Sequence, residues 1–395
     1  MTLALNQVST IFLSVALLVL GSFLVKKASL LQRFCIPAPV VGGLLFAIVA
    51  TVLKASGAAE ISLDTSLQSL FMLTFFTTVG LGASFKLIKL GGKLLVIYWI
   101  ACGFLALAQN VIGVSLASLF GIHPLIGMMA GAVSMEGGHG AATAFGQTVE
   151  DLGIPSALAI GIAAATFGLV AGGLVGGPTV KYLIAKHNLK PTEVEDTAKN
   201  VEEAAQPIVT NAFFTQVLLI TFCMAVGTYL GGLFSTATGF VLPGYVGAMF
   251  VAVIVRNVVD KFKPDAIDMK SINLISDVTL GIFLSMALMS IKLWEVAALA
   301  LPMLVIVFVQ VVFIVLFGIF VLFRLLGKNY DAAVMVAGFT GHGLGATPNA
   351  MANMAAVTER FGPSRKAYLV VPIVGAFLID VFAMPIIITT INLLK

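Results

Sequence analysis

The stretch GMMAGAVSMEGGHGAATAFG, residues 127–146, decides the fold, because it is largely apolar yet interrupted by glycine, histidine and threonine. A second stretch of this kind, AGFTGHGLGATPNAMANM, occupies residues 337–354. The two apolar segments that contain them, near 124–148 and 330–357, are too broken for ordinary membrane-spanning helices. Irregular backbone at membrane depth is tolerated only where protein or a cavity satisfies it. We therefore predict two re-entrant hairpins beside a functional site.

The composition places the chain in a membrane. Of its 395 residues, 59% are hydrophobic and 10% charged, and the mean hydropathy is +1.09. A soluble domain carries about 25% charged residues. The net charge of +4 comes from short loops, so we expect no nucleic-acid partner. Lys26 and Lys27 follow the first apolar block instead of preceding it, which predicts a retained membrane helix and not a cleaved signal peptide.

Ten apolar blocks are long enough to be candidate spanning helices. They lie near 8–25, 36–53, 67–85, 94–120, 156–183, 210–233, 241–257, 271–291, 296–323 and 366–393.

The basic residues set the orientation of these blocks. If the N-terminus is outside and ten spans alternate, 19 of the 22 Lys and Arg residues fall in inner loops, and only Lys54, Lys292 and Lys395 fall outside. This asymmetry is the positive-inside pattern. It predicts ten crossings, with both termini outside and a cytoplasmic central loop. Each hairpin must then enter and leave on one side, the first opening outward and the second inward.

The two halves of the sequence resemble each other at an offset of 204 to 210 residues. The matched pairs are Pro37 with Pro243, Phe76 with Phe283, Thr143 with Thr347, and Phe167 with Phe377. We predict an all-α polytopic fold of two inverted five-helix repeats, residues 1–185 and 209–395, each with a re-entrant hairpin and joined by a cytoplasmic linker, 186–208. Inverted repeats are typical of secondary transporters, whose site lies between discontinuous helices. A channel built on an old duplication remains an alternative.

The hairpins carry the candidate binding groups. Their glycines let backbone N–H and C=O groups face a ligand without a Cβ atom, and their polar side chains add ligand atoms. Candidate substrate-binding residues are Ser134, Gly137, Gly138, His139, Gly140, Thr143, Gly343, Gly345, Thr347 and Asn349. For Gly172, Gly173, Gly176 and Gly177 we favour close helix packing.

Asp380 is the strongest candidate for a cation ligand, because a carboxylate in the middle of a span is costly and usually functional. A structural hydrogen bond is its alternative role. Glu136 in the first hairpin, with Thr166 and Thr340, completes the candidate Na⁺ ligands. We place Asp277 and Asp331 at a membrane edge.

The histidines and cysteines indicate no further site. His139 and His342 could relay protons, but neutral packing and hydrogen bonding is the interpretation we favour. Cys35, Cys102 and Cys223 are far apart and form no CxxC, so neither a disulfide framework nor a zinc site is indicated.

The chain resembles the bacterial sodium/glutamate symporters over nearly its whole length. The likeness rests on IPAPVVGGLL at 36–45, SMEGGHGAATAFG at 134–146, ATFGLVAGGLVGGP at 165–178, FLSMALMSIKLWE at 283–295, GKNYDAAVMVAGFTGHGLGATPNAMANMAAVTERFGP at 327–363 and VVPIVGAFLID at 370–380. Two positions depart from the pattern. Glu136 stands where a small hydroxyl residue is usual, and His342 where a less polar residue is expected, so either could change cation stoichiometry or specificity.

This resemblance implies Na⁺-coupled uptake of L-glutamate, alternating access of the elevator type, and a homodimer. It places residues 137–140 and 343–346 at the translocation path. All five arginines lie in loops or at span ends. We therefore expect backbone donors at Gly138–Gly140 and Gly343–Gly345 to hold the substrate carboxylates, with Na⁺ as coupling ion and no other cofactor.

Three other functions stay open. A Na⁺- or H⁺-driven carrier of another small carboxylate fits the same residues. A channel is less compatible with paired hairpins opening to opposite faces. An enzyme is disfavoured because the chain has no HExxH or GxSxG motif and its hairpin histidines are far apart in sequence.

Overall fold

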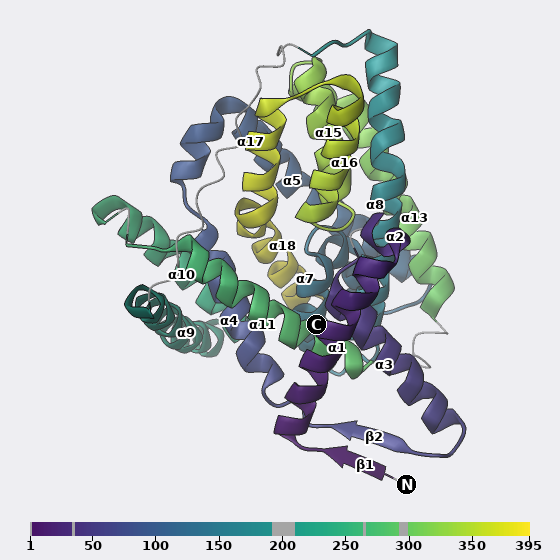
Figure 1. Ribbon diagram of the computed structural model, residues 1–395, viewed down its shortest axis with the longest axis vertical. Coiled ribbons are helices and arrows are strands. Elements are labelled where there is room, and N and C mark those ends of the chain that lie inside the picture. Colours follow the sequence, from purple (N-terminus) through teal and green to yellow (C-terminus); the bar gives the residue numbers. More distant parts are fainter. Residues whose placement is uncertain (1, 34–35, 192–209, 264–265, 292–298) are drawn as a thin grey trace.

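The computed structural model describes residues 2–33, 36–191, 210–263, 266–291 and 299–395 (Figure 1). Most of the predicted linker 186–208 lies outside the described residues, as do Cys35, Lys292 and the start of the predicted span 296–323. The described part of the chain is almost entirely helical. Its only strands, β1 (Thr2–Leu5) and β2 (Glu60–Leu63), pair in parallel, with Thr2 opposite Glu60.

The described residues of the first half form eight α-helices. They are α1 (Gln7–Lys27), α2 (Ser29–Arg33), α3 (Ala38–Ala55), α4 (Gln68–Gly82), α5 (Lys86–Leu119), α6 (Pro124–Met128), α7 (Gly138–Asp151) and α8 (Ala157–His187). A π-helical turn, Met129–Val133, continues α6. Gly92, with φ 58° and ψ −149°, breaks α5 near its start.

The described residues of the second half form nine α-helices. They form α9 (Thr210–Thr238), α10 (Gly244–Phe262), α11 (Met269–Met289), α13 (Ala300–Phe317), α14 (Phe323–Leu325), α15 (Tyr330–His342), α16 (Thr347–Phe361), α17 (Arg365–Ile373) and α18 (Ile379–Leu394). π-helical turns join α13 to α14 and α17 to α18.

Seven helices of the described chain are long and apolar enough to cross a membrane. They are Gln7–Lys27, Ala38–Ala55, Gly91–Leu119, Ala157–His187, Phe213–Thr238, Met269–Met289 and Ala300–Leu325. The other three predicted spans are also helical but differ from ordinary spans. α4 has only 15 residues, α10 carries Arg256, Asp260 and Lys261 near its end, and the last span is divided between α17 and α18.

One matched pair of the two halves occupies equivalent positions. Pro37 directly precedes α3 with ψ 142°, and Pro243 directly precedes α10 with the same ψ. The pair Thr143 and Thr347 does not coincide, because Thr143 lies in the second turn of α7, whereas Thr347 begins α16. These two threonines, although matched in sequence, therefore occupy different positions in their hairpins.

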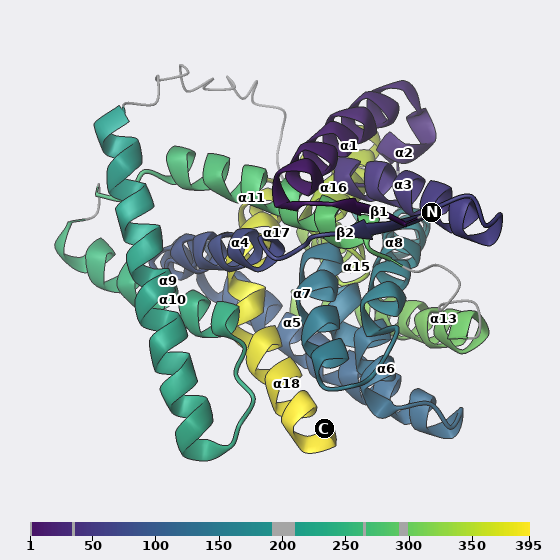
Figure 2. The same ribbon diagram turned by 90° about the horizontal axis from the view of Figure 1, so that it is seen from below.

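The helices form two groups, which Figure 2 shows from below. The flanking group contains α1, α2, α3, α4, α9, α10 and α11, which pack chiefly on one another. The core group contains α5–α8 and α13–α18, and its helices likewise pack together. A shared apolar layer lies between them, where Val40 of α3 and Leu284 of α11 meet Ala142 of α7 and Ile162 of α8.

Hydrogen bonds join the groups at one end of the molecule. The Asn392 side chain in α18 accepts from the Val241 N–H at 2.6 Å and donates to the Val241 carbonyl at 2.9 Å. Within the flanking group, Arg256 and Asn257 of α10 donate to the Leu81 and Ala83 carbonyls at the end of α4. These carbonyls have no partner within α4, so α10 satisfies the end of this short helix.

Candidate functional site

The first hairpin consists of α6, the π-helical turn and α7. Gly131, at φ −100° and ψ −133°, breaks the incoming helix inside the turn. The Ser134 hydroxyl lies 2.7 Å from the Gly161 carbonyl of α8 and also bonds to the Met129 carbonyl. Ser134 therefore closes the turn and attaches it to α8. Its predicted role as a substrate ligand is untested, but its oxygen already has structural partners.

The second hairpin consists of α15 and α16, and polar side chains fix it in place. The amides of Asn349 and Asn353 donate to the Leu169 and Gly172 carbonyls of α8, both at 3.1 Å. Gln109 of α5 donates to the Gly343 carbonyl at 2.7 Å. These bonds join the tip of the second hairpin to α5 and its outgoing arm, α16, to α8.

Helix packing explains two of the four glycines assigned to it. A Cβ atom on Gly172 would lie 2.9 Å from the Asn349 amide nitrogen, and one on Gly176 would lie 2.2 Å from that of Asn353. Gly177 has open space at this position, so close packing does not account for it.

The two hairpin tips touch. Gly138 begins α7 with φ +59°, and a Cβ atom there would lie 2.7 Å from the Gly345 carbonyl oxygen. An L side chain is disfavoured both by this backbone conformation and by the contact. Glycine at position 138 is what permits this close approach of the two hairpins.

A cavity of about 450 Å³ lies beside this contact, between the two helix groups. From the core group it is lined by Gly137, Gly138, His139, Gly140, Ala141, Ala346, Pro348 and Asp380. From the flanking group it is lined by Leu18, Pro37, Pro39, Phe75, Phe76, Val79, Asp277, Leu280, Gly281 and Leu284. The volume lies within the range of small-molecule sites, about 300–1,000 Å³.

Helix N-termini supply donors at the cavity. α7 begins at Gly138, so the N–H groups of Gly138, His139 and Gly140 have no acceptor within the helix. α16 begins at Thr347, beside the lining residues Ala346 and Pro348. An N-terminus of this kind favours anions through free N–H groups and the helix dipole.

The donors predicted at the second tip are already occupied. The Gly343 N–H donates to the Phe339 carbonyl at 2.9 Å, and the Gly345 N–H to the His342 carbonyl at 3.3 Å. At the start of α16, Pro348 has no N–H and the Asn349 N–H donates to the Ala346 carbonyl at 3.0 Å, so the donor left at this helix start is the Thr347 N–H. The place of Gly343 and Gly345 on the translocation path stays a prediction.

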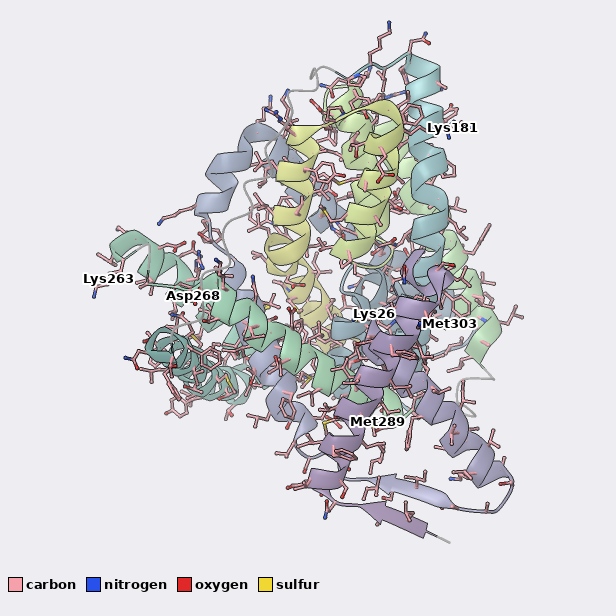
Figure 3. The ribbon with its side chains drawn as sticks, viewed as in Figure 1. Lys26, Lys181, Lys263, Asp268, Met289 and Met303 are labelled. Carbon is pink, nitrogen blue, oxygen red and sulfur yellow. The ribbon has the colours of Figure 1, made fainter. Side chains whose placement is uncertain are left out.

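Two carboxylates line the cavity, Asp380 from the core group and Asp277 from the flanking group. Asp380 follows the π-helical turn Val374–Leu378 and begins α18. Asp277 lies midway along α11, which Figure 3 shows between Asp268 and Met289. Asp277 lines the cavity, a position that the sequence did not predict, and its expected place near a membrane edge stays a prediction. Asp331 is instead paired with Lys366 at 3.5 Å, near the start of α15.

The threonines predicted to bind the cation differ in their surroundings. Thr166 donates to the Ile162 carbonyl and lies 2.9 Å from His139 Nε2, directly behind the cavity. Thr340 donates to carbonyls of its own helix, at 3.1 Å from Val336 and 2.9 Å from Ala337. Thr340 does not line the cavity. Back-bonding of this kind is common for buried threonine, so Thr166 is the better placed of the two.

Two predicted site hydroxyls remain to be placed. Thr143 is fully buried in α7, and its hydroxyl has no partner among the described residues. Thr347 is half-buried beside Gly375, where a Cβ atom would lie 2.8 Å from the Thr347 hydroxyl.

The two positions that depart from the expected sequence pattern lie next to each other. Glu136 is 6% exposed, and neither carboxylate oxygen has a hydrogen-bond partner among the described residues. One of its oxygens, a ring nitrogen of His342 and Cys102 Sγ all lie within 4.8 Å of one another. Sequence reasoning considered these three residues separately, since nothing in the spacing of positions 102, 136 and 342 indicates their proximity.

A membrane chain whose broken hairpins meet at a cavity between two helix groups has the architecture of a secondary transporter. A family model described as sodium/glutamate symporter matches residues 3–363. The chain belongs to the sodium/glutamate symporter family.

Individual proteins agree with this assignment. The chain is 43% identical over 383 residues to the sodium/glutamate symporter of Escherichia coli, covering 95% of each chain. It is 40% identical over 387 residues to that of Haemophilus influenzae, covering 96% of each. Among solved structures, the sodium proton antiporter MjNhaP1 from Methanocaldococcus jannaschii is similar at 15% identity and a TM-score of 0.47, covering 97% of this chain and 95% of that one.

Proposed function

We propose that the chain carries out Na⁺-coupled symport of L-glutamate into the cell by alternating access. Its family, and its similarity to the sodium/glutamate symporters of Escherichia coli and Haemophilus influenzae, support the substrate and the coupling ion. The observation that carries the proposal is the cavity, which combines free helix N-termini at the hairpin tips with the carboxylate of Asp380.

Charge explains why the substrate needs a cation. Glutamate carries two carboxylates and one ammonium, and Asp277 and Asp380 already bring acidic groups to the cavity. No arginine or lysine of the described chain lines it. If only helix dipoles held an anion there, each worth about half a charge, the negative charges of the two carboxylates would repel it. Na⁺ bound near Asp380 offsets this charge, with Thr166 and Glu136 as further candidate ligands.

The division into two helix groups supports an elevator-type cycle. The hairpin tips and Asp380 belong to the core group, whereas the opposite wall belongs to the flanking group. Side chains in the layer between α3, α11, α7 and α8 are apolar. Movement of the core group against such a layer breaks few directional bonds, so the cavity can open to either side.

Two inverted repeats, 1–185 and 209–395, follow from the same proposal. The steady sequence offset between the halves and the equivalent prolines before α3 and α10 support them. We further propose a homodimer in the bacterial inner membrane, with both termini periplasmic and the 186–208 linker cytoplasmic. Single cysteines at Ala141 and Ala346 test the topology. The first should react with an impermeant thiol reagent from outside and the second from inside, and reaction of both from one face would contradict opposed hairpins.

The function is tested by uptake of radiolabelled L-glutamate into proteoliposomes with an imposed Na⁺ or H⁺ gradient. We expect accumulation above the external concentration only with the Na⁺ gradient. Competition by unlabelled dicarboxylates would identify a carrier of another small carboxylate. Equilibration without accumulation, at a rate that does not saturate, would indicate a channel instead.

A further inference from the structure

We propose that Cys102, Glu136 and His342 form an inhibitory site for a divalent transition-metal ion of the Zn²⁺ type, next to the proposed Na⁺ site at the cavity, with which it shares Glu136 as a candidate ligand. The three residues come from α5, from the turn of the first hairpin and from the end of α15. All three are buried, and their ligand atoms lie within 4.8 Å of one another.

The spacing of the donor atoms suits a tetrahedral ion. Cys102 Sγ lies 3.7 Å from His342 Nε2. With Zn–S about 2.3 Å and Zn–N about 2.0–2.1 Å, tetrahedral coordination places these ligand atoms roughly 3.5 Å apart. The Glu136 carboxylate, which has no hydrogen-bond partner among the described residues, needs only a small side-chain shift to become the third ligand. Water or a substrate group would fill the fourth position.

Tyr98 fixes the orientation of His342 that such a site requires. Its hydroxyl lies 3.3 Å from His342 Nδ1. A histidine that ligates a metal characteristically donates its other ring N–H to a neighbouring oxygen. With Nδ1–H directed at Tyr98, the lone pair on Nε2 faces Cys102. The partner that a metal-bound histidine needs is therefore already in place.

Charge and donor type determine the class of ion. A divalent ion bound by one thiolate, one carboxylate and a neutral imidazole gives a site with no net charge, which reduces the cost of burial. The Cys102 proton is released on binding. Sulfur and nitrogen donors favour Zn²⁺ and related ions over hard cations such as Na⁺. The cation that drives transport therefore does not compete well here.

The effect of occupation follows from the elements that the ion would join. Glu136 lies two residues before Gly138, the tip residue of the first hairpin, and His342 ends the incoming arm of the second. A metal ion held by both, and by α5, ties the two tips together. Movement of the core group as a whole is not hindered, because all three ligands belong to it. The ion instead blocks separation of the two tips at the Gly138–Gly345 contact, the opening that we infer admits substrate, and uptake stops while substrate and Na⁺ are still present.

Cobalt binding tests the site without requiring transport. In the purified full-length protein, Co²⁺ should give a thiolate charge-transfer absorption band that Zn²⁺ abolishes by displacement. Cys102→Ser should lose the band, whereas Cys223→Ser, a change at a buried cysteine of α9, should keep it. His342→Phe and Glu136→Gln should each weaken Zn²⁺ binding roughly 100-fold or more, since even outer-shell changes cost 10–100-fold.

Uptake provides the second measurement. Zn²⁺ should inhibit Na⁺-driven glutamate uptake by wild type and by Cys223→Ser, each relative to its own zinc-free rate, and should not inhibit Cys102→Ser at the same concentration. Absence of the Co²⁺ band in wild type, or its persistence in Cys102→Ser, would overturn the proposal. Should Cys102→Ser fail to fold, the affinity losses in His342→Phe and Glu136→Gln decide in its place.

Discussion

The two hairpins share a sequence character but differ in how their polar groups are used. At the first tip, α7 begins with three free N–H groups, and Glu136 has no hydrogen-bond partner among the described residues. At the second tip, the N–H groups of Gly343 and Gly345 are bonded within the turn, and asparagine side chains tie the outgoing arm to α8. The first tip therefore offers binding capacity, whereas the second is held rigidly against it.

The contact between the tips gives the largest expected effect. Gly138→Ala places an L residue at positive φ, at about 1–2 kcal/mol, and pushes a methyl group against the Gly345 carbonyl. We expect glutamate uptake to fall at least about tenfold. Gly121→Ala is the matched control, because Gly121 has φ +67° with nothing within 4 Å. Equal losses in the two variants would show that backbone strain alone, not the tip contact, matters.

Asp380 tests whether the cation belongs to the cavity beside the first tip. Asp380→Asn removes the carboxylate but keeps the shape, so the Na⁺ concentration for half-maximal glutamate binding should rise at least about tenfold. Asp277→Asn, on the opposite wall, should change it less. Isothermal titration at several Na⁺ concentrations measures both variants. An unchanged Na⁺ requirement in folded Asp380→Asn would leave this residue a purely structural role.

Because polar side chains hold the second hairpin in place, removing one of them should lower the Tm. Removing a polar group of the first hairpin that has no partner should not lower it. Asn353→Ala removes amide hydrogen bonds to Gly172 and Ala337. With about 0.6 kcal/mol per such bond in a membrane protein, the Tm in detergent should fall by about 1–2 °C. Thr143→Val in the first hairpin removes a buried hydroxyl without a partner, so its Tm should stay level or rise. A fall of similar size in both variants would contradict the comparison.

The smallest effect is expected from the arginines outside the cavity. Arg360 lies in the last turn of α16, at its C-terminal end, far along that arm from the tip. Arg360→Gln should change glutamate affinity by less than about threefold, since a surface charge contributes little. A larger loss in a folded, inserted protein would show that this arginine reaches the substrate and that backbone donors do not suffice.

The sequence predicted the helices well because apolar length is a local property. Each of the ten predicted spans falls on a helix where the structure describes it, and both hairpins break at their glycines. The pairing of β1 with β2 was not predicted, since Thr2 and Glu60 are far apart in sequence. The π-helical turns also have no clear local sequence signal. One of them follows α6, and another directly precedes the helix that carries Asp380.

The candidate site was only partly predictable, because its groups meet through tertiary packing. Glycine, histidine and aspartate in apolar surroundings identified Gly138, His139 and Asp380, which line the cavity. Asp277 was assigned to an edge because its place along α11 cannot be related to the hairpins from sequence alone. The proximity of Cys102 to Glu136 and His342 was missed for the same reason: a metal-ligand pattern is visible only when its residues are close in the chain.

The bonds of Asn392 bear on the geometry of the transport cycle. At one end of the core group this side chain is bonded twice to Val241, whereas the layer around Ile162 is apolar. A rigid body attached at one end and free to slide at the other rotates about its attachment. In the elevator-type cycle proposed above, displacement would therefore grow with distance from Asn392, the hairpin tips would travel less than the remote ends of α8 and α16, and the substrate would move along an arc.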